Sequence, residues 1–406
     1  MQVRVLPMIQ KVIKMEPIIK SLLDQDWYKF TMGNYYFENF SNGTAKIEFT
    51  DRKDQLPKEQ KFVDQINEQF DYVSELKFRK SELDFIFNVR YMRDKTGYRE
   101  FLRNFQLNRD IIHCELIDDK VAIWTDEDNV MSVSNWEIFI LEIVNELYVD
   151  WMSTLDDDNF LGSYGIKKAV ERKIVEFGKI KMPFIEMGTR RRHSRVFQDA
   201  LIDKLRHNPK FIGTSNPYLA MKYGLTPSGT MAHEIFMYAQ TLKDVPVAQS
   251  QKFTWQTWLK TYKGDLGYAL HDTLGETKFL KDFDILLAKQ YNGPRLDSGD
   301  EFKITKDIIQ MYKDFGIDSK SKTIVYSNCM DIPKCNGLYD EFNGQIRQVA
   351  GIGTNLVCPV YKTNFVAKLV SGNGNRPAAK ISCDAVKAQC KDQEFLEYLK
   401  WSCERD

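Results

Sequence analysis

The sequence predicts an α/β fold in which an irregular or incomplete α/β barrel follows an N-terminal α/β domain that the C-terminal segment completes. The main observation is a repeated unit between about residues 165 and 360, where a short apolar run ends in small or polar residues before a helical stretch. Strands that alternate with helices in this way form βαβ units and a parallel sheet. Seven such units favour a barrel over an open sheet and predict a barrel domain over residues 151–360.

The polar residues at the ends of these apolar runs indicate where a site would lie. Functional residues of parallel barrels lie at the carboxyl ends of the strands. Turn and cap chemistry explains small polar residues there, but it does not explain charged residues at one topological position. The runs are Phe184–Arg190, Phe211–Asn216, Thr226–Thr230, Tyr268–Thr273, Gly293–Asp300, Ile324–Asn328 and Val349–Thr354. The shared site that we expect contains Arg190, His233, Arg295 and Asp297.

Residues 1–150 mix helical and hairpin patterns and are predicted to form the N-terminal domain. Lys61–Leu76 has helical periodicity, and Ile111–Leu116 and Lys120–Thr125 are predicted to be two strands joined by a turn. The strongly apolar stretch Trp136–Met152 predicts a helix that is largely buried.

The segment 361–406 carries the signature of a hairpin. Phe365–Val370 and Arg376–Ser382 flank a turn at Gly372–Asn375. We expect this hairpin to join the N-terminal domain, and we expect a final helix through Phe395–Trp401.

Composition and charge exclude several classes of protein. Lys plus Arg number 57, as do Asp plus Glu, so the formal net charge is zero and predicts no nucleic-acid partner. No run approaches a membrane span, and charges interrupt the N-terminus too often for a secretory signal. The seven cysteines are scattered without a C-x-x-C, which argues against a disulfide framework or a zinc site. We therefore expect a soluble cytoplasmic protein.

The stretch Gly224–Glu234 places a histidine where an anion would bind. Thr230–Gln240 is a predicted helix with Thr230 as its cap and His233 in its first turn. The free N–H groups and the partial positive charge of a helix N-terminus attract anions. His233 is therefore a candidate nucleophile for a phosphate, although a histidine can also just satisfy a backbone carbonyl.

Arginine and aspartate side chains provide the next candidates. Of the run Arg190–Arg192, we expect Arg190 to face the site as a clamp for a carboxylate or phosphate, the alternative being a solvated basic turn. Arg295 and Asp297 are two residues apart at a strand end and lie on one face, where one can hold an anion and the other can accept hydrogen bonds from sugar hydroxyls. Asp300 can reach Mg²⁺ or cap the next helix, and capping alone would explain both aspartates.

Two further segments suggest contacts with a phosphate and a flat ring. Gly351–Asn355 resembles a phosphate cradle, because its glycines permit close backbone approach and Thr354 can bind phosphate oxygens. Tyr28 lies near the start of a predicted helix that Asp24 or Asp26 would cap. Its ring could stack on a planar ligand or belong to the core.

Taken together, these segments resemble the nicotinate phosphoribosyltransferase family, and they occur in the family's order over roughly residues 20 to 382. The D-x-Y-K of the family resembles Asp26–Lys29, and its G-T-R-R-R and G-T-S-N resemble Gly188–Arg192 and Gly213–Asn216. The segment around its phosphorylated histidine resembles Gly229–Glu234, and its D-S-G-D and G-I-G-T-N resemble Asp297–Asp300 and Gly351–Asn355.

The resemblance implies an activity in NAD salvage. Nicotinate and 5-phosphoribosyl-1-pyrophosphate would give nicotinate mononucleotide and pyrophosphate, with Mg²⁺ as cofactor. ATP would be a co-substrate whose hydrolysis is coupled to the transfer, as in a ligase. The implied assembly is a homodimer.

The resemblance also implies roles for individual residues. His233 would be autophosphorylated by ATP, and Tyr28 would stack on the pyridine ring, supplied by the partner subunit. Asp297 would hold the ribose. Arg295 and Thr230 would contact nicotinate, and Gly353 and Thr354 would hold the 5-phosphate. Arg190 and Ser215 would be further substrate contacts.

Some positions depart from the family pattern. Met187 stands before Gly188, where many relatives have an aromatic residue, so one face of the pyridine site would be a sulfur–aromatic contact. Asn328 stands where the family often has Asp, which leaves a ribose or metal role of that loop open. Lys368 fits either a phosphate contact or a solvated strand residue.

Three alternative functions keep parts of this pattern. A nicotinamide-specific enzyme would keep the fold but lose the preference for a carboxylate. A non-catalytic sensor of phosphoribosyl ligands would keep the Gly351–Thr354 cradle, although the joint presence of His233, Arg295 and Asp297 weighs against it. A phosphohistidine carrier would be labelled at His233 without turning over nicotinate.

Overall fold

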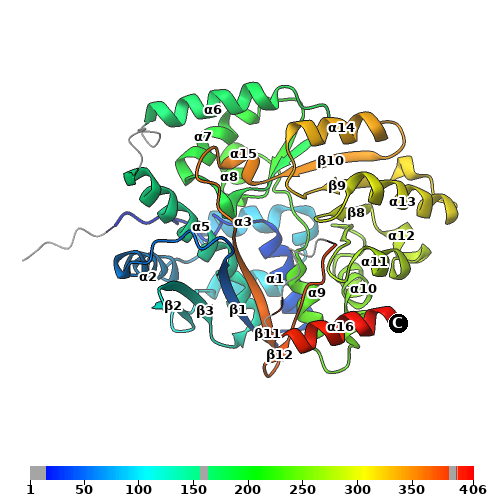
Figure 1. The fold of residues 1–406 in the computed structure, drawn as a ribbon, viewed down its shortest axis with the longest axis horizontal. Coiled ribbons are helices and arrows are strands. Elements are labelled where there is room, and N and C mark those ends of the chain that lie inside the picture. Colours follow the sequence, from blue (N-terminus) through cyan, green and yellow to red (C-terminus); the bar gives the residue numbers. More distant parts are fainter. Residues whose placement is uncertain (1–14, 156–162, 384–389, 391) are drawn as a thin grey trace, which may run out of the picture.

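The computed structural model describes residues 15–155, 163–383, 390 and 392–406, and it contains two sheets with helices around them (Figure 1). The stretch 1–14, which the sequence excludes as a secretory signal, lies outside the described residues. The α/β class predicted from the sequence is confirmed.

The first sheet is antiparallel and is built from both ends of the chain. Its order is β12-β11-β1-β3-β2, with β4 paired to β1. Strand β11 pairs with β1 along Ala45–Asp51, and the two lie side by side in Figure 1. The C-terminal hairpin therefore lies in the N-terminal sheet, while the domain boundaries at 150 and 360 stay a prediction. The strands are β1 (Thr44–Asp51), β2 (Ile112–Ile117), β3 (Lys120–Thr125), β4 (Asp128–Asn129), β11 (Phe365–Gly372) and β12 (Arg376–Pro377).

Helices of the N-terminal domain cover this sheet. The apolar helix α5 packs against β1 and β11 and is buried from Val130 to Val149, so it is longer than the predicted Trp136–Met152. The predicted helix Lys61–Leu76 corresponds to α2. The helices are α1 (Tyr28–Asn39), α2 (Gln60–Ser74), α3 (Lys80–Asn88), the 3-10 turn η1 (Arg90–Met92), α4 (Thr96–Asn104) and α5 (Val130–Leu155).

The second sheet is parallel and forms the incomplete barrel. Its order is β6-β5-β10-β9-β8-β7. The predicted unit at Thr226–Thr230 contributes only an isolated parallel bridge between Thr214 and Pro227 in the described part of the chain, so the strands do not close into a full barrel. The strands are β5 (Phe184–Glu186), β6 (Phe211–Thr214), β7 (Tyr268–Leu270), β8 (Gly293–Leu296), β9 (Thr323–Tyr326) and β10 (Arg347–Ile352).

The helices of the barrel follow the strands in alternation. They are α6 (Ser163–Phe177), α7 (Arg195–Leu205), α8 (Pro217–Tyr223), α9 (His233–Gln240), α10 (Ser250–Tyr262), α11 (Glu276–Asp282), α12 (Ile285–Gln290), α13 (Glu301–Asp314), α14 (Ile332–Phe342) and α15 (Thr354–Val357). The 3-10 turns are η2 (Thr189–Arg191), η3 (Val247–Gln249) and η4 (Ser319–Ser321), and α16 (Gln393–Arg405) is the final helix. In the described ranges, no helix combines the length and the apolar character that crossing a bilayer requires.

The starts of two helices differ from the prediction. Helix α1 begins at Tyr28 after Trp27 and has no side-chain cap, so neither Asp24 nor Asp26 caps it. Both aspartates instead bind residues that are distant in sequence.

Helix α9 begins at His233, with Ala232 as its N-cap and without a side-chain cap. Thr230 therefore does not cap it. The carbonyl of Thr230 accepts a hydrogen bond of 2.6 Å from the Thr31 hydroxyl of α1, which holds this residue outside the helix.

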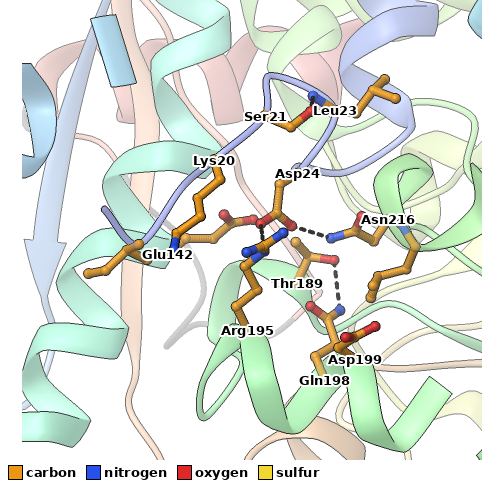
Figure 2. A network of polar contacts seen from close by, with 12 residues as sticks. Lys20, Ser21, Leu23, Asp24, Glu142, Thr189, Arg195, Gln198, Asp199 and Asn216 are labelled. Atoms are coloured by element: carbon orange, nitrogen blue, oxygen red, sulfur yellow. Dashed lines mark hydrogen bonds and ion pairs between the residues drawn. The ribbon is translucent and has the colours of Figure 1, made fainter. Parts of the chain in front are cut away.

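A buried network of charges ties the N-terminal segment to the barrel. Figure 2 shows Asp24 beside Arg195 and Asn216. The fully buried guanidinium of Arg192 binds Asp24 Oδ1 and Glu146 Oε1, both at 2.6 Å. Burial opposes the charge of Asp24, but Arg192 still holds the pKa of that carboxyl below its usual range. The network therefore fixes residue 24 against α5 and η2.

Replacing Arg192 with Met should destabilise the fold strongly, because Glu146 would lose its guanidinium partner and Asp24 would keep only the longer contact of 3.2 Å with Arg195. We expect the free energy of unfolding in urea to fall by about 3–5 kcal/mol. The control is Arg206→Met, which removes a surface pair of 3.1 Å with Asp203 and should cost less than about 1 kcal/mol. Equal losses in the two variants would contradict the role of the buried network.

Candidate active site

A large cavity of about 890 Å³ lies at the carboxyl ends of the barrel strands, against β11 of the N-terminal sheet. His233 at the start of α9 lines it, together with Arg295 and Asp297 from the end of β8. Gly353 and Thr354, which follow β10, line it as well. The structure thus brings together predicted residues that are more than a hundred positions apart in the sequence.

A second, inner cavity of about 280 Å³ lies among the barrel strands and has a largely apolar lining that includes Ile185, Val325 and Val349. Arg190 and Arg295 line both cavities, so the two spaces adjoin. The sequence-predicted residues that line the inner cavity are Tyr28, Arg190, Ser215, Thr230 and Arg295.

His233 is held by an aspartate that the sequence analysis did not single out. Its Nε2 lies 2.7 Å from Asp272 Oδ1 and 3.8 Å from Asp297 Oδ2. The other oxygen of Asp272 lies 2.6 Å from Lys380 Nζ and accepts a hydrogen bond of 2.5 Å from the Ser298 hydroxyl. Both oxygens of Asp272 therefore have partners, and the orientation of the imidazole is fixed.

The protonation of the imidazole follows from these contacts. Burial and the charge of Lys380 lower the pKa of His233 to about 4, although Asp272 opposes them. Burial alone would raise the pKa of Asp272, but His233 and Lys380 hold it well below its usual range. A carboxylate only accepts hydrogen bonds, so Nε2 carries the ring proton and Nδ1 carries the lone pair. The neutral ring therefore presents its lone pair at Nδ1.

Arg295 and Asp297 share one face at the end of β8, as their spacing predicts. The Arg295 guanidinium donates to Ser327 Oγ and to the Met231 carbonyl, both at 3.0 Å, and lies 3.6 Å from Asp297 Oδ1. Burial alone would raise the pKa of Asp297, but Arg295 beside it lowers that pKa to about 2. Asp297 is thus an ionised acceptor in the large cavity, beside Arg295, which lines both cavities.

Arg190 and Tyr28 meet at the inner cavity within one chain. Arg190 Nη1 lies 3.5 Å from the Tyr28 hydroxyl and 3.5 Å from Glu137 Oε1. These contacts are long, so most donors of the guanidinium remain available to an anionic ligand. The Ser215 hydroxyl, which also lines this cavity, donates to Asp26 Oδ1 at 2.5 Å. A single chain therefore supplies both the aromatic ring and the arginines of this cavity.

A buried lysine connects these residues to the start of α9. Lys29 Nζ lies 2.6 Å from Glu137 Oε2 and 2.7 Å from Glu234 Oε2, and it donates to Ser134 Oγ at 3.1 Å. The Tyr36 hydroxyl donates to Glu234 Oε1 at 3.1 Å. Glu234 follows His233 directly, so α1 and α5 of the N-terminal domain hold the first turn of α9.

Two glycines at the end of β10 lie close to Met187. A Cβ on Gly351 would lie 2.5 Å from Met187 Sδ, and one on Gly353 would lie 3.0 Å from the Met187 carbonyl oxygen. The backbone can therefore approach the end of β5 closely and present Thr354 to the large cavity. Met187 lines both cavities.

The wall of the large cavity is rich in cations. Its basic residues, besides Arg190 and Arg295, are Arg52, Lys53, Arg191, Lys362, Lys368 and Lys380. Burial, with the nearby charges of Lys380 and Arg52, lowers the pKa of Lys368 to about 7. Mutual repulsion of this kind indicates a surface suited to phosphate groups.

Among the described residues, His233, Asp272 and Asp297 form a cluster whose potential ligand atoms lie within 4.8 Å of one another. The carboxylate of Asp272 is engaged by Lys380 and Ser298, and that of Asp297 accepts a hydrogen bond of 2.9 Å from the Ser327 hydroxyl. The exposed Asp300, predicted as a metal ligand or a cap, accepts hydrogen bonds of 3.0 and 3.2 Å from backbone N–H groups of α13 and caps that helix.

Three residues of the site were not identified from the sequence. Asp272 lies in the predicted unit Tyr268–Thr273, so its position at a strand end was the available signal. Glu137 is an acidic residue within an apolar helix, which is a signal of a buried ion pair. Lys380 lies in the C-terminal hairpin, and no local pattern distinguishes it.

Asn328 is buried, and its amide donates to the Gly299 carbonyl at 3.3 Å, which joins the loops after β8 and β9.

We expect the His233 ring to titrate near pH 4 in the folded chain and near the ordinary value of 6.5 in the urea-unfolded chain, which serves as the control. Between these two values the unfolded chain binds a proton that the folded ring does not, so this residue lowers the free energy of unfolding as the pH falls from 6.5 to 4. NMR of ¹⁵N-labelled histidine, assigned with His233→Gln, measures both values. A folded-state midpoint at or above the unfolded one would show that the ring is not held neutral.

Comparisons with known proteins agree with this geometry. The chain matches the model of the nicotinate phosphoribosyltransferase (NAPRTase) N-terminal domain over residues 23–145. It also matches the model of the nicotinate phosphoribosyltransferase (NAPRTase) family over residues 182–404.

Individual relatives match over nearly their whole length. The nicotinate phosphoribosyltransferase of Chromobacterium violaceum is 36% identical, over 95% of this chain and 97% of that protein. That of Ralstonia pickettii is 34% identical, over 94% and 98%.

Solved structures agree in fold. A putative nicotinate phosphoribosyltransferase from Saccharomyces cerevisiae superposes with a TM-score of 0.87 at 29% identity, over 97% of this chain and 100% of that one. The nicotinate phosphoribosyltransferase from Porphyromonas gingivalis gives 0.86 at 25% identity, over 95% and 100%. Both family models and relatives matched over nearly the whole chain show that this chain belongs to the nicotinate phosphoribosyltransferase family.

Proposed function

We propose that this chain transfers the phosphoribosyl group of 5-phosphoribosyl-1-pyrophosphate to nicotinate, and that it couples this transfer to ATP hydrolysis through a phosphohistidine at His233. The observation that carries the proposal is the neutral imidazole of His233, held by Asp272 at a cation-lined cavity that adjoins an apolar one. Family membership supports the transfer, and the histidine geometry supports the coupling.

The inner cavity suits nicotinate. Its apolar lining and the ring of Tyr28 can take a flat pyridine, while Arg190 and Arg295 face the same space. A guanidinium pairs with a carboxylate through two parallel hydrogen bonds, and a neutral amide leaves that charge unpaired. We therefore propose that the arginines select nicotinate over nicotinamide.

The transfer needs charge stabilisation more than a strong base. The pyridine nitrogen attacks the anomeric carbon as pyrophosphate leaves, so positive charge develops on the ribose while negative charge develops on the leaving group. Asp297 would accept hydrogen bonds from ribose hydroxyls, and the loop of Gly353 and Thr354, which lines the same cavity, would bind the 5-phosphate. Asp297 would also hold Mg²⁺, which when bound neutralises charge on the pyrophosphate.

The coupling to ATP would begin at His233. The lone pair of Nδ1 attacks the γ-phosphorus, the bond to the bridging oxygen breaks, and ADP leaves. Asp272 accepts a hydrogen bond from Nε2 and stabilises the positive charge that the ring gains. Hydrolysis of the phosphohistidine would then drive transfer forward.

Two further proposals concern the cellular location and the oligomeric state of the enzyme. The balanced charge of the sequence fits a cytoplasmic location, and a homodimer is the assembly that the family resemblance implies. Tyr28, Arg190 and Arg295 line one cavity of a single chain, so the proposed pyridine site does not depend on that assembly.

The direct test measures nicotinate mononucleotide formed from nicotinate, 5-phosphoribosyl-1-pyrophosphate and Mg²⁺, with and without ATP and with nicotinamide in parallel. We expect product from nicotinate that increases with ATP, and His233→Ala should lower the ATP-dependent rate at least about 100-fold, since the nucleophile is lost. The exposed His207→Ala is the matched control and should keep the wild-type rate.

The other outcomes separate the alternatives. Product from nicotinamide alone would favour the nicotinamide-specific enzyme. A labelled His233 without product would favour the carrier, and ligand binding without turnover would favour the sensor. Each of these would overturn the proposed function.

Arg190→Met should weaken the selection of nicotinate, because a charged hydrogen-bond donor to the carboxylate is lost. We expect kcat/KM for nicotinate to fall roughly 10- to 100-fold, equivalent to about 1.5–3 kcal/mol. The exposed Arg172→Met serves as the control. An unchanged kcat/KM in Arg190→Met would show that this arginine does not contact the carboxylate.

A further inference from the structure

The segment 378–383, here called the C-terminal arm, leaves the N-terminal sheet and lies across the barrel next to His233. The backbone N–H of Ala379 donates to Gln240 Oε1 at 2.8 Å, and Gln240 Nε2 donates back to the Ala379 carbonyl at 2.9 Å. The N–H of Ile381 donates to the Thr273 carbonyl at 2.9 Å. Gln240 ends α9 and Thr273 follows Asp272, so the arm bridges the two elements that carry His233 and Asp272.

A second anchor joins the arm to the loop after β8. The Cys383 N–H donates to Ser298 Oγ at 3.2 Å, and the Ser382 hydroxyl lies 3.2 Å from the same oxygen. Ser298 in turn donates to Asp272 Oδ2. The arm therefore contacts Asp272 in two ways: directly through Lys380, and indirectly through Ser298.

Lys380 is the charged residue that the arm brings into the site. Its side chain is 3% exposed, and its Nζ lies 2.6 Å from Asp272 Oδ2. Asp272 is fully buried, and its ligand oxygen lies within 4.8 Å of a carboxylate oxygen of Asp297. Two carboxylates this close repel each other, and a buried carboxylate without a counter-ion is strongly unfavourable. Lys380 supplies the counter-ion that keeps Asp272 in place.

The effect of Lys380 on His233 is indirect. The ammonium binds Oδ2 of Asp272, while Oδ1 binds Nε2 of the imidazole. Partners in this outer position fix the tautomer and the orientation of a functional histidine. If Asp272 rotated away, the proton on the ring would no longer be held at Nε2, and Nδ1 would not present its lone pair reliably.

We propose that Lys380 is a positioning residue for the phosphorylation of His233: it fixes Asp272, which holds the proton on Nε2 and leaves Nδ1 free to attack. This inference rests on the proposed function, because it requires His233 to accept the phosphoryl group. The alignment of the nucleophile thus depends on the C-terminal arm, more than a hundred residues away in the sequence.

The first experiment is a rapid-quench measurement of acid-labile ³²P incorporation from [γ-³²P]ATP in the full chain. We expect Lys380→Met to lower the limiting rate constant of phosphorylation roughly 10- to 100-fold, with the ATP concentration at half-saturation within about threefold of wild type. Lys380→Arg keeps the positive charge and should recover part of the rate. The exposed Lys400→Met is the matched control and should behave as wild type.

The second experiment does not depend on turnover. The ¹⁵N shifts of the His233 ring should report a proton on Nε2 in the wild-type chain and a mixture of tautomers in Lys380→Met, with Lys380→Arg closer to wild type. Lys368→Met, which removes a different lysine of the same cavity, should leave the tautomer unchanged. Circular dichroism identifies a variant that fails to fold, and Lys380→Arg then carries the test.

The outcomes distinguish this inference from the function on which it rests. A wild-type chain that is not labelled at His233 overturns the proposed coupling and this inference with it. A labelled wild type whose tautomer and limiting rate are unchanged in Lys380→Met overturns this inference alone. A higher ATP concentration at half-saturation in Lys380→Met, with an unchanged limiting rate constant, would make Lys380 a phosphate contact and would also overturn this inference.

Discussion

The site depends on the buried ammonium of Lys29 between Glu137 and Glu234. A charge that is removed from water is tolerated only with close partners, and Lys29 has carboxylates at 2.6 and 2.7 Å. The three residues come from α1, α5 and α9, so one electrostatic requirement fixes the N-terminal domain against the helix of His233. Tyr28 precedes Lys29 and is thereby held beside Arg190, at the entrance to the barrel interior.

Because the barrel is open, other segments of the chain must complete the wall of the large cavity. Between β6 and β7 the described residues add only an isolated bridge from Thr214 to Pro227, which does not join β7, so the parallel sheet alone does not enclose a ligand. Enclosure comes from β11 and the C-terminal arm, which are held by the N-terminal sheet. Both ends of the described chain therefore converge on residues that the barrel strands present, and function requires the whole assembly.

Local chemistry could be predicted from the sequence, while distant partnerships could not. The strand ends, the shared face of Arg295 and Asp297 and the place of His233 in the first turn of α9 all follow from spacing and turn residues. Asp24 and Asp26 were misassigned as caps because a carboxylate before a helix has the same local pattern whether it caps or binds a distant group. Lys380 and Glu137 have partners chosen by the tertiary fold alone, which no local pattern reports.

The charges of the site also explain why it should take anionic substrates. Carboxylates neutralise Lys29, Arg192 and Lys380. Among the described residues, no carboxylate forms an ion pair with the other cations that line the large cavity, which are Arg52, Lys53, Arg191, Lys362 and Lys368. Burial and neighbouring charge lower the pKa of Lys368 to about 7 and that of Arg191 to about 10. Such repulsion lowers the stability of the protein, and a bound phosphate would relieve it, so this relief would contribute to the binding free energy. The same argument makes a neutral His233 necessary, since a further cation there would repel its neighbours and lose its nucleophilic lone pair.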